Sequence, residues 1–297
     1  MVYKQTKLRK WISLSKLNWS ELSSNPNSIE LLKNNIDKID WYILSENPNA
    51  IELLKANPSK INWDNLSCNP NSIELLKANL EKINWNFLSY NLNAIEILKA
   101  YPNKINWDNL SCNPNAIELL KANPKKIDWS YLSYYPNAIE LLKTYPNKIN
   151  WNILSANKNA IELLKANPSK IDWSYLSENE NAIDILKTYP DKIDWDYLSA
   201  NKNAIELLKA NLKKIDWGYL SENKNAIEIL KENQNKIDWN MISSNPSIFT
   251  YDYELIHNNF KNLGEEIIYK ALHPKRMLRL MNEYGEDEIY KCYFDEI

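Results

Sequence analysis

Tryptophan recurs along this chain at a constant interval of 22 residues. Of the 12 tryptophans, only Trp11 departs from the interval. The others are Trp19, Trp41, Trp63, Trp85, Trp107, Trp129, Trp151, Trp173, Trp195, Trp217 and Trp239. A fixed period between about 20 and 50 residues is typical of proteins that stack many copies of one small structural unit. The sequence therefore predicts a tandem array whose fold can be worked out for a single repeat.

The repeat has a constant frame. Ten full copies run from Trp19 to Asp238, and an eleventh begins at Trp239. When each copy is numbered from its tryptophan as position 1, all ten carry Leu at position 4, Ser at 5, Asn at 9, Ile at 11, Leu at 14, Lys at 15 and Lys at 20. Position 22 is always Asp or Asn. These residues are the ones expected to build the fold.

The first half of each repeat carries the signals of a short helix. Asp or Asn at position 22 immediately precedes the next tryptophan, where its side chain can accept hydrogen bonds from free backbone N–H groups. Leu at position 4 lies on the same helical face as the tryptophan. Asn at position 7, present in all copies but the one with Tyr135, and Pro at position 8, present in half of the copies, predict the end of this helix.

The second half predicts another short helix. In the sixth copy, Asn137 precedes the apolar run and Glu140 follows three residues later, which resembles a capping box in which the acid reaches back to the start of the helix. Lys143 lies three residues past Glu140 on the exposed side, and Pro146 predicts the end of the helix. Asn at position 9 is thus the expected N-cap.

Helices of roughly seven and eight residues are too short to be stable in isolation. Stacking of the repeats must therefore supply the stability, through burial of the recurring Trp, Leu and Ile side chains. We expect an all-α solenoid of about 11 tandem 22-residue units, each of two short helices, with the tryptophans in its structural core. At about 8 to 10 Å between helices, the stack would span about 100 Å.

A strand alternative also has support. Ile171, Trp173 and Tyr175 alternate, and Leu-Ser-x-Asn resembles the leucine-rich repeat, whose asparagine lines a ladder beneath a curved sheet. Two places where that repeat needs apolar side chains are polar here, so the helical prediction is preferred.

Composition narrows the classes of function. The formal net charge is -2, from 36 basic and 38 acidic residues, so the chain has no excess of positive charge to neutralise nucleic acid or an anionic membrane. No secretory signal or membrane span is expected from the sequence. Cys68 and Cys112 occupy the same place in different repeats, which indicates side-chain variation rather than a disulfide pattern, and a reducing intracellular location follows.

The run N-P-N-A-I-E-L-L-K-A-N-P-x-K-I-[DN]-W-x-x-L-S resembles the 22-residue tandem repeats of uncharacterised proteins from giant DNA viruses of amoebae and algae, mimivirus relatives among them. The resemblance covers residues 19 to about 246. Residues 270–276 also resemble a closing segment of such proteins. The resemblance implies a helical repeat protein located in the cytoplasm of the host cell or in the virion, and it brings no catalytic residue or ligand.

Both ends of the chain depart from the repeat. Because end repeats of a solenoid expose a face that inner repeats bury, we expect residues 1–18 to form an N-terminal cap, with the array over residues 19–246. Apolar residues at helical spacing predict a C-terminal helical cap over residues 247–297, including a stripe of Met277, Leu278, Leu280 and Met281.

The chain offers little catalytic chemistry. His257 and His273 lie near Glu265, Glu266 and Cys292 in sequence, but no metal-binding spacing such as HExxH or CxxC accompanies them. The serines at position 5 belong to the repeat frame rather than to a nucleophile motif. We predict no catalytic residue, no metal and no cofactor.

Recognition in a repeat protein falls to the positions that vary, and tyrosine is prominent among them. It occurs at position 3 late in the array, at position 6 in two copies, and at position 17 in alternate copies, which gives part of the array a 44-residue superperiod. These candidate partner-binding residues are Tyr90, Tyr101, Tyr131, Tyr134, Tyr145, Tyr175, Tyr189, Tyr197 and Tyr219. Exposed tyrosines favour a protein interface, although the same rings could instead fill grooves between repeats.

The sequence thus predicts a non-catalytic helical scaffold that binds another protein, as a viral adaptor or a binder of host factors. Two alternatives stay open. A helical repeat can read nucleic acid one base per repeat, although the charge makes nucleic acid an unlikely partner. The chain could also be a structural component of the virion.

Truncation of one repeat tryptophan tests its part in stability. We expect Trp129→Ala to lower the free energy of unfolding by about 3 to 5 kcal/mol, as large-to-small core substitutions do. Chemical denaturation measures this change, and an unchanged midpoint would refute a core role for the ring.

Overall fold

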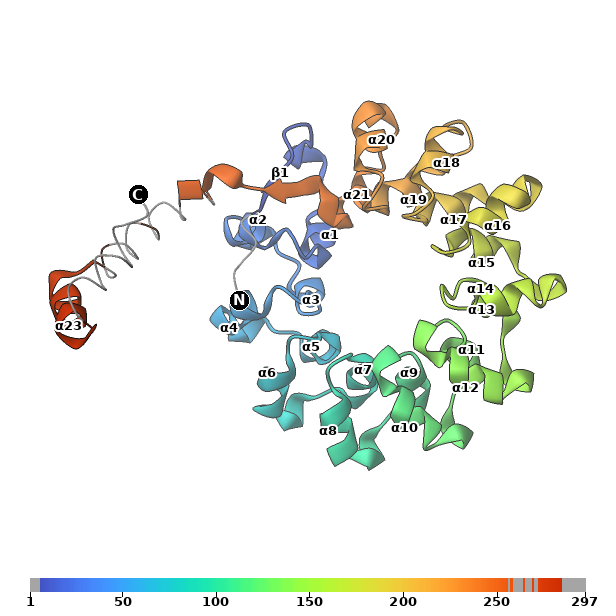
Figure 1. Ribbon diagram of the computed structural model, residues 1–297, viewed down its shortest axis with the longest axis horizontal. Coiled ribbons are helices and arrows are strands. Elements are labelled where there is room, and N and C mark those ends of the chain that lie inside the picture. Colours follow the sequence, from blue (N-terminus) through green and yellow to red (C-terminus); the bar gives the residue numbers. More distant parts are fainter. Residues whose placement is uncertain (1–5, 256, 259–263, 265–268, 270–271, 285–297) are drawn as a thin grey trace. The chain divides into compact units, whose positions relative to one another are not determined.

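The computed structural model describes residues 6–255, 257–258, 264, 269 and 272–284 (Figure 1). The chain divides into two compact units, Leu8–Phe249 and a second one formed by Met1–Lys7 with Thr250–Ile297. The larger unit is an array of short α-helices that pack against one another, repeat after repeat. The predicted all-α repeat fold is confirmed.

The first helix of every repeat begins at its tryptophan. These helices are α1 (Trp19–Ser24), α3 (Trp41–Leu44), α5 (Trp63–Cys68), α7 (Trp85–Tyr90), α9 (Trp107–Ser111), α11 (Trp129–Leu132), α13 (Trp151–Ser155), α15 (Trp173–Glu178), α17 (Trp195–Ala200), α19 (Trp217–Glu222) and α21 (Trp239–Ser244).

The second helix begins at the isoleucine of position 11. These helices are α2 (Ile29–Lys33), α4 (Ile51–Ala56), α6 (Ile73–Lys77), α8 (Ile95–Ala100), α10 (Ile117–Lys121), α12 (Ile139–Thr144), α14 (Ile161–Lys165), α16 (Ile183–Thr188), α18 (Ile205–Lys209) and α20 (Ile227–Glu232).

Short 3₁₀ turns connect the helices. Most lie at positions 18 to 20: η1 (Leu14–Lys16), η2 (Ile36–Lys38), η3 (Pro58–Lys60), η4 (Leu80–Lys82), η5 (Pro102–Lys104), η7 (Pro124–Lys126), η9 (Pro146–Lys148), η10 (Pro168–Lys170), η11 (Pro190–Lys192) and η12 (Gln234–Lys236). Others follow the first helix at positions 8 to 10: η6 (Pro114–Ala116), η8 (Pro136–Ala138) and η13 (Pro246–Ile248).

The predicted cap of the first helix is present. In repeat 8, the Asp172 carboxylate accepts hydrogen bonds from the backbone N–H groups of Ser174 at 3.1 Å and Tyr175 at 3.2 Å. The Asp or Asn at the start of the other first helices accepts in the same way, which satisfies donors that a helix leaves free at its N-terminus.

The predicted cap of the second helix was wrong. Its N-cap is the Ala or Ser at position 10, which makes no side-chain capping bond. Asn at position 9 instead donates to the preceding repeat, as when Asn181 Nδ2 binds the carbonyl oxygen of Lys158 at 2.9 Å. The acid at position 12 pairs with Lys at position 15, as Glu162 does with Lys165 at 2.9 Å. Asparagine at this position therefore joins repeats and does not begin a helix.

The centre of each repeat is occupied by its two leucines. Leu176 and Leu186, at positions 4 and 14 of repeat 8, are both 0% exposed, and Ala182 lies between the helices at 0%. The Trp173 ring packs against this core but stays partly exposed, as do the other repeat tryptophans. Truncation of a partly exposed ring lowers the free energy of unfolding less than truncation of a buried one. We therefore expect the lower end of the range given for Trp129→Ala.

A ladder of buried asparagines connects consecutive repeats through position 7. In repeat 8, Asn179 Nδ2 donates to the carbonyl oxygens of Ser155 and Asn157 in repeat 7, both at 2.9 Å. Its Oδ1 accepts the N–H of Asn181 at 3.0 Å. One buried side chain thus satisfies two carbonyls of the neighbouring repeat and one amide of its own.

The ladder has one interruption, in repeat 6. Tyr135 replaces the asparagine there, so no side-chain amide at this position reaches the carbonyls of Ser111 and Asn113. The backbone carbonyl of Tyr135 still accepts from Asn157 Nδ2 at 2.8 Å, so the ladder resumes at the next repeat.

The array closes on itself. Helix α21 of repeat 11 packs against α1 of repeat 1. Asn25 Nδ2 donates to the carbonyl oxygens of Ser243 at 2.9 Å and Asn245 at 3.0 Å, as Asn47 Nδ2 of repeat 2 does to those of Ser23 and Asn25 in repeat 1. The Leu8–Phe249 unit is therefore a ring, with the first helices on its inside and the second helices outside (Figure 1).

Repeat 11 is assembled from both ends of this unit. Its first helix is α21, whereas residues 14–18 supply positions 18 to 22, including the turn η1. Lys16 Nζ lies 4.8 Å from the centre of the Trp239 ring, as Lys38 lies 4.6 Å from that of Trp19 within repeat 1. Asn18 then caps α1. The end faces of the array cover each other, and residues 14–18 belong to a repeat.

The smaller unit contributes fewer described elements. Strand β1 (Thr6–Leu8) pairs with β2 (Phe249–Tyr251), and Lys7 Nζ binds Asp252 Oδ1 at 3.0 Å. The predicted stripe at Met277 falls in α23 (Pro274–Tyr284). The rest of the predicted C-terminal cap includes residues outside the described ones, so this cap stays a prediction.

Ring closure can be tested with two matched substitutions. Asn25→Ala removes the amide at the closing junction, and Asn179→Ala removes its counterpart inside the array. Each leaves one buried serine carbonyl, that of Ser243 or Ser155, without a donor, while the asparagine carbonyl beside it keeps a backbone N–H donor. We therefore expect each variant to lower the free energy of unfolding by about 1 to 3 kcal/mol in urea denaturation. An open array would instead tolerate Asn25→Ala at almost no cost.

Candidate partner-binding surface

The side of each first helix that faces away from the core carries positions 3 and 6. Positions 4 and 5 are buried, and in an α-helix positions 3 and 6 lie on the opposite side. The first helices form the inside of the ring (Figure 1). Because their buried positions face the core, we infer that positions 3 and 6 face the ring axis. We call the surface formed by positions 3 and 6 the inner face.

Electrostatic contacts agree with this placement. Glu222 at position 6 of repeat 10 is influenced by the charge of Glu21 at position 3 of repeat 1, although repeat 11 lies between them. Side chains that point to the axis of a ring converge, whereas those on its outside diverge. Burial and the nearby carboxylates of Glu21 and Asp238 raise the pKa of Glu222.

Four of the nine predicted tyrosines occupy position 3. Tyr175, Tyr197 and Tyr219 form a row over repeats 8 to 10, with ring centres 6.0 Å and 6.4 Å apart, and the second pair is stacked. Tyr131 is 53% exposed and Tyr219 47%. The rings of Tyr175, Tyr197 and Tyr219 contact one another across the repeats, and all four tyrosines are at least partly exposed.

Two more tyrosines occupy position 6 of the inner face. Tyr90 is 39% exposed and Tyr134 46%. The Tyr134 ring meets Tyr135 edge-on, with ring centres 5.5 Å apart. Six of the predicted residues thus share one surface.

The three tyrosines at position 17 belong elsewhere. Tyr101, Tyr145 and Tyr189 pack on the tryptophans of their own repeats, at ring-centre distances of 5.1, 4.8 and 5.3 Å. In other repeats a lysine ammonium from position 20 covers the tryptophan, at 4.2 Å over Trp151 and 4.5 Å over Trp195. The 44-residue superperiod of tyrosine at position 17 therefore follows whether a tyrosine ring or a lysine ammonium covers the tryptophan ring.

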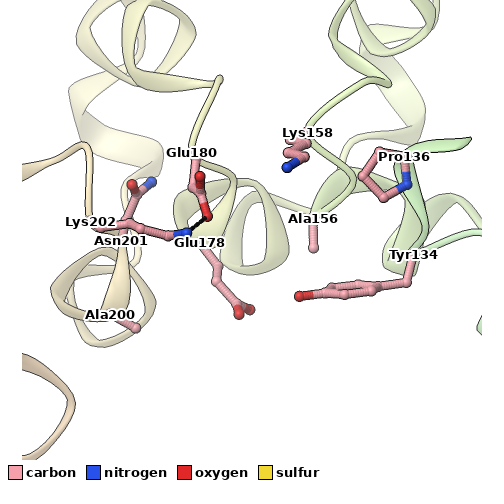
Figure 2. Close-up of a pocket in the computed structure, with 9 residues that line it drawn as sticks. All are labelled: Tyr134, Pro136, Ala156, Lys158, Glu178, Glu180, Ala200, Asn201 and Lys202. Carbon is pink, nitrogen blue, oxygen red and sulfur yellow. Dashed lines mark ion pairs between the residues drawn. The ribbon is translucent and has the colours of Figure 1, made fainter. Parts of the chain in front are cut away.

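A pocket of about 300 Å³ spans repeats 6 to 9. Positions 6 and 8 supply nearly all of its lining: Tyr134, Pro136, Ala156, Lys158, Glu178, Glu180, Ala200, Asn201 and Lys202. Figure 2 shows the Tyr134 hydroxyl and the Glu178 carboxylate pointing toward one another. Glu180 and Lys202 form an ion pair at 2.5 Å.

Burial shifts the pKa of two groups in this pocket, Glu178 and Tyr134. Burial raises the pKa of the Glu178 carboxyl. Burial, with the charges of Glu178 and Glu180, also raises the pKa of Tyr134, and Lys202 acts in the opposite direction. Glu178 was not among the predicted site residues. Its only signal was its place at the variable position 6.

The two described cysteines have raised pKa values, and the described residues contain no metal-binding cluster. Burial raises the pKa of Cys68 to about 12 and that of Cys112 to about 11, so both thiols stay protonated near neutral pH. No cluster of three or more His, Cys, Asp or Glu side chains that could hold a metal occurs among the described residues. Glu265, Glu266 and Cys292 lie outside them.

Within the same described residues, no helix is both long and apolar enough to cross a bilayer. Comparison of the chain with protein-family models, with curated proteins and with solved structures finds no match.

The burial of Glu178 predicts a pH-dependent stability. Its pKa is raised in the folded state, so ionisation destabilises the fold above that pKa, whereas below the ordinary glutamate value of about 4.3 both states are protonated. We expect Glu178→Gln to melt at a higher temperature than the wild type near pH 7. The difference should shrink as the pH falls to about 4.

Thermal melts across this pH range measure the effect. Glu52→Gln is a suitable control, because Glu52 is exposed and paired with Lys55 at 2.9 Å. Its replacement should leave the melting temperature unchanged or slightly lower. A Glu178→Gln variant that melts below the wild type at neutral pH would contradict the burial argument.

Proposed function

We propose that this chain is a non-catalytic scaffold that holds a protein partner on the inner face of its ring. The row of exposed aromatic rings at position 3 carries the proposal. Tyrosine offers a large apolar area at low entropic cost together with a hydroxyl group for polar contacts, and it is enriched where protein partners bind most tightly.

The division between frame and variable residues supports this role. The leucines, serines and asparagines that hold the repeats together are buried. The serines and asparagines already make hydrogen bonds to the neighbouring repeats. By contrast, Tyr131 and Tyr219 are about half exposed on the inner face. Their side chains are available to a partner without disturbing the array.

The charge of the inner face favours a protein over nucleic acid. Glu21, Glu178 and Glu222 all lie on it, and carboxylates repel a phosphate backbone. Together with the resemblance to giant-virus repeats, this leads us to propose a viral adaptor that binds a host or viral protein inside the infected cell.

Affinity purification with matched variants tests the proposal. Tyr197→Ser combined with Tyr219→Ser alters the inner face, whereas Tyr145→Ser combined with Tyr189→Ser alters tyrosines that cover tryptophans. We expect the inner-face variant to lose a partner that the other variant retains, with affinity reduced about tenfold or more, because interface tyrosines each contribute on the order of 1 kcal/mol or more.

Each purification is repeated after nuclease treatment, and both variants are first checked for unaltered unfolding. Loss of the captured protein on nuclease treatment, or recovery of RNA at physiological salt, would favour a nucleic-acid binder instead. Equal capture by both variants would remove the inner face from consideration.

A further inference from the structure

We propose that the pocket over repeats 6 to 9 binds an arginine side chain of the partner, with the guanidinium group between Glu178 and Tyr134. This inference rests on the proposed protein-binding function and names the chemical feature that the inner face recognises. It follows from the charge, the burial and the arrangement of the groups that line the pocket.

The first argument is an unpaired carboxylate. Glu178 is half-buried, and within the described residues its carboxylate has no hydrogen bond or ion pair. The ammonium of Lys202 cannot serve it, because that group binds Glu180. A carboxylate withdrawn from water without a partner gains more from a bound cation than an exposed one does.

The second argument is the aromatic ring across the pocket. The Tyr134 hydroxyl points toward Glu178 and the ring lies behind it, below Pro136, Ala156 and Lys158 in the view of Figure 2. Guanidinium is planar, so it can lie over an aromatic ring while its N–H groups donate to a carboxylate in a forked geometry. Lysine offers only a compact, strongly hydrated ammonium, so arginine fits this pair of groups better.

The third argument is the asymmetry of the remaining charges. Lys158 on the upper wall is exposed, so water already solvates its ammonium group. An anionic ligand would meet the unpaired carboxylate of Glu178 and gain little from Lys158. A partner backbone can instead place a carbonyl oxygen near Lys158 while its arginine enters the pocket. A volume of about 300 Å³ is at the small end for ligand pockets and suits one long side chain.

A titration with small model compounds tests the pocket without knowing the partner. The probes are N-acetyl-arginine methylamide, its lysine counterpart and its citrulline counterpart, which keeps the shape of arginine but carries no charge. Binding is followed by NMR of tyrosine ring signals in the full chain, with the Tyr134 signal identified by its loss in Tyr134→Phe. We expect saturable shifts of Tyr134 with the arginine compound, weaker binding of lysine and none of citrulline.

Two variants at the same repeat position make the test specific. Glu178→Gln should weaken binding of the arginine compound about tenfold or more, as loss of a charge-assisted hydrogen bond does. Glu222→Gln changes the position-6 glutamate of repeat 10, outside the pocket, and should bind like the wild type. Both variants are checked by thermal melting, so that a loss of fold is not mistaken for a loss of binding.

Equal binding of arginine and citrulline, or wild-type binding by Glu178→Gln, would overturn the inference. The proposed function can survive that result, because capture of the partner through Tyr197 and Tyr219 is measured separately. If Glu178→Gln weakens the arginine compound and also releases the captured partner, both proposals are supported together.

Discussion

The structure depends on the buried amide of the asparagine at position 7. Each repeat ends its first helix with carbonyl groups that the helix itself cannot satisfy, and they are too deeply buried to reach water. Asn179 Nδ2 serves two of them in the neighbouring repeat. The apolar contacts between leucines would tolerate some sliding of one repeat on another, whereas these hydrogen bonds fix the register. The same bonds join Asn25 to repeat 11, so one interaction both builds the array and closes it.

Because the constant residues of the repeats satisfy one another's hydrogen bonds, the exposed positions are free to vary. Ser177 shows how complete the internal bonding is: its hydroxyl donates to the carbonyl of Trp173 and accepts the N–H of Asp194. Positions 3, 6 and 8 vary along the array, and they carry the tyrosines, the glutamates and the lysines that distinguish one repeat from the next. The inner face therefore changes its chemistry around the ring while the backbone beneath it does not.

Local signals in the sequence predicted the local structure well. The helix that starts at each tryptophan follows from the Asp or Asn before it, and the N-cap bonds of Asp172 are those expected. The second cap could not be predicted in this way, because the side chain of Asn181 donates to the carbonyl of Lys158 in the adjacent repeat, a contact that no local pattern shows. The leucine-rich-repeat comparison had drawn attention to an asparagine ladder. The ladder exists, but between helices.

Closure of the ring was the feature that sequence reasoning did not reach. It depends on a small rotation from each repeat to the next, which no local pattern states. A signal was nevertheless present: Leu14 to Asn18 matches positions 18 to 22 of a repeat, the part that repeat 11 lacks. The role of the Tyr145 ring was similarly hidden, because the pattern gave the alternation of tyrosine and asparagine at position 17 but not the tryptophan ring that the tyrosine covers.

Because repeat 11 is divided between the two ends of the array, the number of repeats in such a protein cannot change freely. Open solenoids gain and lose repeats by duplication or deletion, because any number of units can be stacked. In a closed ring the turn contributed by each unit must sum to a full circle, and residues 14–18 must meet α21 in register. The number of repeats is then fixed by the geometry of the ring. Differences in surface chemistry must come from substitutions at the positions of the inner face.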